Sequence, residues 1–195
     1  MAKTNTEIVD RAVRFAVEKH AGAARKGSDT PYIVHPMEAA AVVAGITGDQ
    51  DLIAAALLHD TLEDTATTYD EILTLFGKRV ADLVAGESED KQADKPAKET
   101  WRDRKQKTID ELKNAGYESK LLVLADKLSN IRAMERDLEE KGEKLWDRFN
   151  QKDPQMHAWY YGSIADILSA DPALKDTQAC REYVQRVKAT FGKYL

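Results

Sequence analysis

The chain has 195 residues, of which 43% are hydrophobic and 32% are charged, and its formal net charge is −5. This length is enough for one domain with its own core, and the composition is that of an ordinary globular protein. The acidic balance argues against a general nucleic-acid binder, which needs a basic face, although a local basic cluster suffices for a small anion. No apolar run has the length of a membrane-spanning helix, so we expect no membrane partner.

Cysteine usage and the N-terminus indicate the compartment. Cys180 is the only cysteine, which excludes an internal disulfide and fits a reducing environment. The first residues lead into an amphipathic segment without the apolar run of a signal peptide. We therefore expect a cytoplasmic protein, and we leave its oligomeric state open.

Apolar residues recur at helical spacing along most of the chain, and no useful strand-like alternation is present. We predict a single all-α domain over residues 1–195, a bundle of roughly 9–10 helices. Asp-Pro pairs at 153–154 and 171–172 have the pattern of helix starts, and the polar stretch 87–98 is predicted as a loop. The predicted helices are roughly 7–22, from 35–36 to 45, 52–62, 68–76, 78–86, 99–114, 117–140, 142–150, 154–170 and 172–193.

The predicted helix 52–62 is apolar on nearly every side, which indicates a central, buried position. Asp49 or Asp51 can cap its start. Its C-terminal end carries the adjacent pair His59 and Asp60. Neighbours on a regular helix point about 100° apart, so both can meet at one ion only where the last turn is distorted.

Four residues together suggest a metal site: His35, His59, Asp60 and Asp126. Taken singly, each is more often a polar surface or capping residue. Asp126, however, ends the apolar run 121–126, where an unpaired carboxylate is costly to bury. Two imidazoles and two carboxylates suit divalent manganese, iron or zinc. Such an ion makes water nucleophilic near neutral pH and polarises a phosphoryl oxygen, so the pattern favours a phosphate-ester hydrolase.

Glu63 and Asp64 lie four residues after His59 and Asp60, which places each on the same helix face as its counterpart. Glu63 is then well placed to orient or deprotonate a water and to protonate a leaving group. The alternative is a solvated carboxylate at a helix end.

These motifs resemble the HD-domain metal-dependent phosphohydrolases, and more closely the alarmone hydrolase domain of the Rel/Spo proteins. The resemblance covers about the first two thirds of the chain, within 12–132, and leaves a helical extension at 140–195. Because no synthetase or regulatory region follows, the chain is similar to the stand-alone small alarmone hydrolases. The segments that carry the resemblance are 16–27, 30–36, 56–65, 76–80 and 124–132.

The resemblance implies manganese-dependent removal of the 3′-pyrophosphate from guanosine tetra- and pentaphosphate, the nucleotides of the stringent response. It implies His35, His59, Asp60 and Asp126 as metal ligands and Glu63 and Asp64 as the pair acting on water. It also implies Arg25 and Lys26 as contacts to the base and phosphates and Asn130 as a contact to the ribose and base. Planar Arg on a purine and Lys as a point charge on phosphate suit these roles. His20 belongs to the motif as a structural or supporting residue rather than a ligand.

The segment 145–161 departs from the family pattern and is rich in aromatic residues. It is either a hydrophobic corner between two helices or a wall on which a purine stacks. Because a tyrosine of this region contacts the nucleotide in related hydrolases, Tyr160 or Tyr161 is predicted to bind substrate. The departure keeps an adenosine alarmone open as a substrate. Cations available for the phosphates are Arg102, Arg104, Lys105, Lys127 and Arg132.

Two alternatives remain. An HD hydrolase for another nucleotide, such as a nucleotide monophosphate or NADPH, would keep the metal residues but discard Arg25 and Asn130. A non-catalytic nucleotide-binding module would be expected to lose a ligand or Glu63. The chain retains all of these residues, which favours the alarmone hydrolase.

Overall fold

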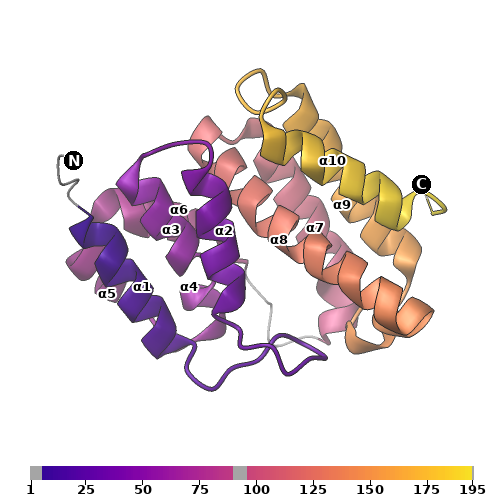
Figure 1. Ribbon diagram of the computed structural model, residues 1–195, viewed down its shortest axis with the longest axis horizontal. Coiled ribbons are helices and arrows are strands. Elements are labelled where there is room, and N and C mark those ends of the chain that lie inside the picture. Colours follow the sequence, from indigo (N-terminus) through magenta and orange to yellow (C-terminus); the bar gives the residue numbers. More distant parts are fainter. Residues whose placement is uncertain (1–5, 90–95, 195) are drawn as a thin grey trace. The chain divides into compact units, whose positions relative to one another are not determined.

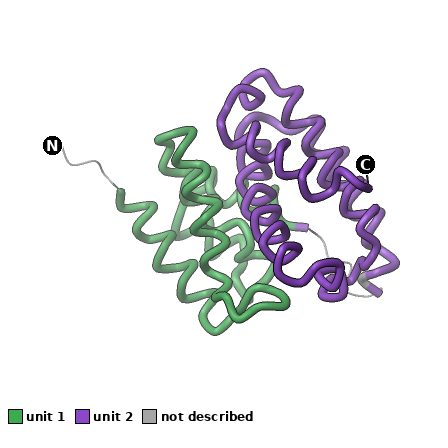
Figure 2. Tube along the Cα trace, turned by 45° about the vertical axis from the view of Figure 1, so that its right-hand side comes forward, with its two compact units in different colours: residues 1–88 green, residues 89–195 purple. Residues whose placement is uncertain are grey.

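The computed structural model describes residues 6–89 and 96–194, and every regular element in these ranges is helical. They form ten α-helices and one 3₁₀-helix, η1, which confirms the all-α prediction. Residues 90–95 of the predicted loop lie outside the described ranges. Of the helices described, none combines the length and apolar character needed to cross a membrane. The chain divides into two compact units, residues 1–88 and 89–195 (Figure 2).

The first unit is built around one buried helix, α3, which packs against α1, α2 and α6. Six of its nine residues are buried, so the prediction of a central helix is confirmed. The first helix is shorter than predicted and ends at Lys19 rather than near residue 22. The elements of this unit are α1 (Glu7–Lys19), α2 (Val34–Ala44), α3 (Gln50–Leu58), α4 (Thr61–Asp64), α5 (Tyr69–Phe76) and α6 (Lys78–Glu87) (Figure 1).

The start of α3 is fixed by Asp49, whose carboxylate accepts from the backbone N–H groups of Asp51 (3.0 Å) and Leu52 (3.3 Å). The Arg79 guanidinium of α6 donates two hydrogen bonds to the same carboxylate, at 2.7 and 3.0 Å. The hydrogen bonds from Arg79 hold the pKa of Asp49 below its usual value. This pair therefore ties α6 to the first turn of the central helix.

The end of α3 differs from the prediction. The helix was predicted to run to residue 62, but it ends at Leu58, and α4 begins only at Thr61. The buried Thr61 hydroxyl donates to the Leu58 carbonyl at 2.7 Å, which satisfies an acceptor at the helix end with a side chain. His59 and Asp60 consequently lie in an interruption between two helices.

The second unit is organised around the long helix α8, which packs against α9, α10 and η1, while α7 packs on α9. Asp153 caps α9 as predicted, since its carboxylate accepts from the Gln155 N–H at 2.9 Å. The elements are α7 (Ala97–Asn114), α8 (Tyr117–Lys141), η1 (Gly142–Arg148), α9 (Pro154–Ala170) and α10 (Gln178–Phe191).

The predicted helix start at residues 171–172 is wrong. Asp171 accepts from the Ala173 N–H at 3.0 Å and from the Lys120 ammonium at 2.9 Å, so its carboxylate closes a turn instead of capping a helix. The last helix begins at Gln178, where the Thr177 hydroxyl accepts from the Cys180 N–H.

The aromatic segment 145–161 contributes to the core of the second unit. Trp146 is buried and stacks on His157 with a ring separation of 5.3 Å, and Phe191 of α10 lies 5.9 Å from the same indole. These contacts favour the hydrophobic-corner interpretation. Trp159 differs, because it is half-buried and carries the Arg102 guanidinium 4.6 Å from its ring centre.

Candidate metal site and its surroundings

Three of the four predicted ligands converge where α3 is interrupted. The Nε2 atoms of His35 and His59 lie 3.2 Å apart. Oδ2 of Asp60 lies 3.0 Å from Nε2 of His59 and 3.4 Å from Nε2 of His35. Both imidazoles are buried. His35 comes from the first turn of α2, so this helix and the two residues between α3 and α4 supply the cluster.

The hydrogen bond of His59 determines which nitrogen faces this cluster. Its Nδ1 lies 2.8 Å from the Ala56 carbonyl oxygen. Because a carbonyl only accepts, Nδ1 carries the proton, and in the neutral ring Nε2 presents its lone pair to His35 and Asp60. A metal-binding histidine is commonly oriented in this way, by a second hydrogen bond to a backbone carbonyl.

The spacing of the three atoms fits a divalent cation. Bonds of about 2.1 Å meeting at roughly 90° to 110° hold donor atoms about 3.0 to 3.4 Å apart, and the three observed separations are 3.0, 3.2 and 3.4 Å. Burial alone would raise the pKa of Asp60, but the charge and hydrogen bonds of His59 and His35 in their protonated form outweigh it and lower that pKa, and a cation bound in place of those protons would act in the same direction. The carboxylate is therefore in the ionised form that binds metals.

Tyr32 joins this cluster from the loop between α1 and α2. Its hydroxyl lies 2.6 Å from Oδ2 of Asp60 and 3.0 Å from Oδ2 of Asp64. Burial and these two carboxylates raise the pKa of the phenol, so it stays protonated and donates. The sequence motif contained Tyr32, but residue pattern alone assigned it no role.

The predicted base-binding residues lie on the same loop. The Arg25 guanidinium stands 5.6 Å from the centre of the Tyr32 ring, and Lys26 is exposed beside it. Backbone hydrogen bonds from Arg25 to Thr30 (2.8 Å) and from Tyr32 to Ala23 (2.9 Å) close the loop. The backbone at Gly27 has a φ of 76°, a conformation that glycine adopts at little cost.

Glu63 and Asp64 both lie on the short helix α4. Glu63 is half-buried and Asp64 is exposed. The Asp64 N–H donates to the Asp60 carbonyl at 2.9 Å, so one helical turn connects the cluster to the two carboxylates. His20 at the end of α1 is buried and stacks on Tyr32 at 4.9 Å.

The remaining predicted residues belong to the second unit. Asp126 is buried on α8, where it accepts from the Lys127 ammonium and from the Asn130 amide one turn later. An unpaired carboxylate is costly to bury, and these two side chains are among the partners of Asp126. Burial alone would lower the pKa of Lys127, but Asp126 outweighs it and raises that pKa.

The two predicted tyrosines differ in their surroundings. Tyr161 packs in the core of the second unit, against Phe191 and Tyr183, whose hydroxyl donates to its carbonyl. Tyr160 is also buried, but its ring has the ammonium groups of Lys105 and Lys127 at 5.0 and 5.9 Å. Tyr160 is therefore the tyrosine of the pair that lies among cations.

Four of the five candidate phosphate cations, Arg104, Lys105, Lys127 and Arg132, are engaged with carboxylates. Arg104 and Lys105 of α7 both contact Glu89, whose pKa they lower against the opposing effect of burial. Arg132 makes two contacts of 2.8 Å to Glu182 of α10, which is a link between helices.

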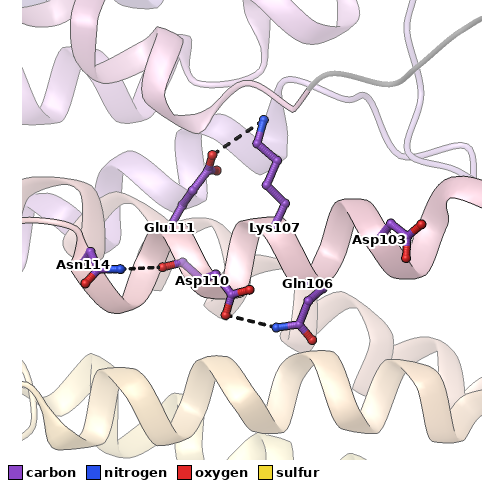
Figure 3. A pocket seen from close by; sticks show the side chains of 6 residues that line it. All are labelled: Asp103, Gln106, Lys107, Asp110, Glu111 and Asn114. Carbon is purple, nitrogen blue, oxygen red and sulfur yellow. Dashed lines mark hydrogen bonds and ion pairs between the residues drawn. The ribbon is translucent and has the colours of Figure 1, made fainter.

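A hollow of about 770 Å³ lies along α7 but offers no comparable chemistry (Figure 3). Its side chains bond to one another along the single helix: Gln106 to Asp110 at 3.1 Å and Lys107 to Glu111 at 3.6 Å. Most of the lining residues are exposed, so this is an ordinary solvated helix face.

Comparison with known families agrees with this geometry. The family model described as "HD domain" matches residues 12–155. The chain belongs to the HD-domain family. The match includes all four predicted ligands of this HD domain, because it extends through Asp126.

Several relatives of this HD domain are named as alarmone hydrolases, and others, from Brucella, are named GTP pyrophosphokinase. The chain is 38% identical to the zebrafish (Danio rerio) guanosine-3′,5′-bis(diphosphate) 3′-pyrophosphohydrolase MESH1, over 68% of this chain and 72% of that protein. It is 40% identical to the Aquifex aeolicus guanosine-3′,5′-bis(diphosphate) 3′-pyrophosphohydrolase, over 72% of this chain but only 20% of that longer protein.

Two solved structures resemble this HD domain. Listeria monocytogenes lmo0812 is similar with a TM-score of 0.71 and 31% identity, over 81% of this chain and 99% of that one. A metazoan ortholog of SpoT, described as hydrolysing ppGpp and acting in starvation responses, has a TM-score of 0.71 and 25% identity over the full length of both chains.

Proposed function

We propose that this HD domain is a metal-dependent hydrolase that removes the 3′-pyrophosphate from guanosine tetra- and pentaphosphate, leaving GDP or GTP. The observation that carries the proposal is the convergence of His35, His59 and Asp60 within 3.4 Å of one another, in a chain with several relatives that are named for this reaction. The group acted on is a phosphate ester, which a divalent ion activates by polarising a phosphoryl oxygen and lowering the pKa of water.

We further propose Asp126 as the remaining metal ligand and manganese as the ion. The motif match through Asp126 supports the first. The mixed imidazole–carboxylate set is compatible with manganese, iron or zinc, and the resemblance to the alarmone hydrolases favours manganese among them. Metal analysis of the purified protein, with reconstitution by manganese, iron or zinc after chelation, tests both. Asp126→Ala should lose the bound ion, and retention of one equivalent of metal would remove Asp126 from the ligand set.

The carboxylates of α4 have the proposed proton-transfer roles. Water forms a bond to the phosphorus attached to the 3′ oxygen, the bond from that phosphorus to the 3′ oxygen breaks, and the leaving oxygen takes a proton. Glu63 is proposed to receive the proton from water and to deliver one to the leaving oxygen, with Asp64 beside it. The helical turn from Asp60 to Asp64 supports this placement.

The remaining proposed roles concern the nucleotide. Arg25 and Lys26 are proposed to contact the base and phosphates, which their shared loop supports. Asn130 is proposed to contact the ribose and base. Tyr160 is proposed to contact the nucleotide, supported by its two neighbouring ammonium groups, and is preferred to Tyr161, which packs in the core. We propose a cytoplasmic location and a part in the stringent response. The family that the sequence resembles acts on the nucleotides of that response.

Product analysis tests the reaction. The protein with manganese is incubated in parallel with guanosine and adenosine tetraphosphate alarmones, and the products are separated by anion exchange. Release of a nucleoside 5′-diphosphate and pyrophosphate supports the proposal, and the relative rates determine the preferred base. If neither alarmone is cleaved while metal is bound, the proposal is wrong, and nucleotide monophosphates and NADPH become the substrates to test.

A further inference from the structure

Tyr32 contacts four of the residues to which the site of the first unit assigns a role, Asp60, Asp64, His35 and Arg25. Its hydroxyl meets Asp60 and Asp64. Its ring lies against the edge of His35, with ring centres 5.9 Å apart, and beneath the Arg25 guanidinium. These neighbours have different proposed roles: metal binding, proton transfer and contact with the nucleotide.

We propose that Tyr32 is a positioning residue that couples the nucleotide-binding loop to the metal-binding and proton-transferring carboxylates. Its hydroxyl orients Asp60 and Asp64, and its ring supports Arg25. The roles of these neighbours rest on the proposed function, whereas the contacts of Tyr32 with them do not.

The hydroxyl acts on the same carboxylate atom that approaches the imidazoles. Oδ2 of Asp60 lies 2.6 Å from the phenol oxygen and 3.0 Å from Nε2 of His59. A hydrogen bond to a carboxylate is short and strong, because the acceptor is charged. Groups that orient a metal ligand in this way typically change metal affinity about 10- to 100-fold when they are removed. Tyr32 is therefore expected to fix the direction of the Asp60 oxygen.

The same hydroxyl brings a second carboxylate to the cluster. Asp64 lies 3.0 Å from the phenol oxygen, and two carboxylates near one point repel each other unless a donor lies between them. The single hydroxyl proton is shared by Asp60 and Asp64. The position of Asp64 relative to the proposed ion thus depends on Tyr32.

Packing, rather than hydrogen bonding, holds the ring itself. His20 stacks on it with an interplanar angle of 34°, and the buried Nε2 of His20 has no hydrogen-bond partner among residues 6–89 and 96–194. A phenylalanine would keep these ring contacts and remove only the hydroxyl. The two functions assigned to Tyr32 are therefore separable by substitution.

The test compares Tyr32→Phe with Tyr32→Leu in the full chain. Tyr32→Phe should weaken manganese binding about 10- to 100-fold and lower kcat for the alarmone. KM should change less than about 2-fold, because the phenylalanine ring still packs against the Arg25 guanidinium. Tyr32→Leu should also raise KM. Tyr69→Phe is the matched control, since Tyr69, at the start of α5, donates a phenol–carboxylate hydrogen bond of 2.7 Å to Asp82. This control should leave manganese affinity, kcat and KM unchanged.

Manganese affinity is measured by calorimetry on chelator-stripped protein without nucleotide, so this result is independent of the substrate. Equal manganese affinity and equal kcat for Tyr32→Phe and the wild type would overturn the proposal while leaving alarmone hydrolysis intact. A wild type that cleaves no alarmone would refute the proposed function, and the calorimetric comparison would still decide whether the hydroxyl orients Asp60. In a double-mutant cycle, Asp64→Asn should reduce the effect of Tyr32→Phe on kcat; full additivity would exclude coupling through Asp64.

Discussion

The Asp60→Asn substitution tests the metal site directly, because it keeps the side-chain shape and removes the charge. In the native cluster one Asp60 oxygen lies 3.0 and 3.4 Å from the two imidazole nitrogens. The two histidines remain after the substitution, but the anionic ligand between them is gone. We expect the protein to fold and to lose most of its affinity for a divalent ion.

The size of the effect follows from binding linkage. An ion present at 100 times its dissociation constant stabilises the native state by about 2.7 kcal/mol. For a chain of this length, 1 kcal/mol shifts the melting temperature by about 2 to 4 °C, so saturating manganese should raise the wild-type Tm by roughly 5 to 11 °C. A variant with about 100-fold weaker binding gains only about 0.4 kcal/mol, or roughly 1 to 2 °C.

The assay is a far-ultraviolet circular dichroism melt of chelator-stripped protein over a manganese titration. Helical ellipticity is the appropriate signal, because both units are helical, whereas all three tryptophans lie in the second unit. Asp82→Asn, a change at an exposed carboxylate of α6, is the matched control. If Asp60→Asn shows the full wild-type increase in Tm, Asp60 is not a ligand and the fit of the three distances to an ion is coincidental.

Three further predictions concern turnover, substrate binding and acid stability. Glu63→Gln should keep the metal and lower kcat on the order of 100- to 10,000-fold, as expected for loss of a general acid–base group; a near-normal rate would show that another group activates water. Arg25→Ala should raise KM for the alarmone with little change in kcat, because it removes a cation that is proposed to contact the nucleotide; an unchanged KM would make Arg25 a surface residue. Arg79 lowers the pKa of Asp49, so this contact stabilises the native state above the unfolded-state pKa of about 3.9, and the stabilisation is lost as pH falls through the lower native-state pKa. Asp49→Asn should therefore cost roughly 0.5 to 1 kcal/mol in urea unfolding at pH 7 and progressively less below about pH 4; a cost that does not depend on pH would contradict this account.

Most of the fold was predictable because apolar periodicity and caps are local signals. Asp153 followed by proline marks the start of α9 in sequence and structure alike. The similar pair at residues 171–172 failed, because Lys120, which is 51 residues away in sequence, engages the Asp171 carboxylate. No local pattern contains that contact, so a turn and a helix start cannot be told apart from the sequence there.

In the candidate site, too, some residues were predictable from local sequence patterns, and others depend on contacts between residues far apart in the chain. His35, His59 and Asp60 were predicted from residue types, and the structure brings these three together. Tyr32 was missed as a contributor, although its motif was noted, because a phenol three residues before a histidine has no chemical signature of its own. Its importance depends on the position of Asp64, 32 residues later. The sequence also could not distinguish Tyr160 from Tyr161, since both are buried on α9 and only their neighbours differ.

The interruption after Leu58 explains how adjacent residues serve one site. On a regular helix the side chains of neighbouring residues point about 100° apart, whereas the backbone at Asp60, with φ of −92° and ψ of −4°, departs from the regular helix. The Thr61 hydroxyl bonds to the Leu58 carbonyl, so the helix ends while its last acceptor remains satisfied. The chain then resumes as α4 and presents Glu63 and Asp64 after a single turn. The Asp60 carboxylate at this local break lies within 3.4 Å of both imidazole nitrogens, and the break is followed directly by Glu63 and Asp64, the carboxylates proposed to act on water.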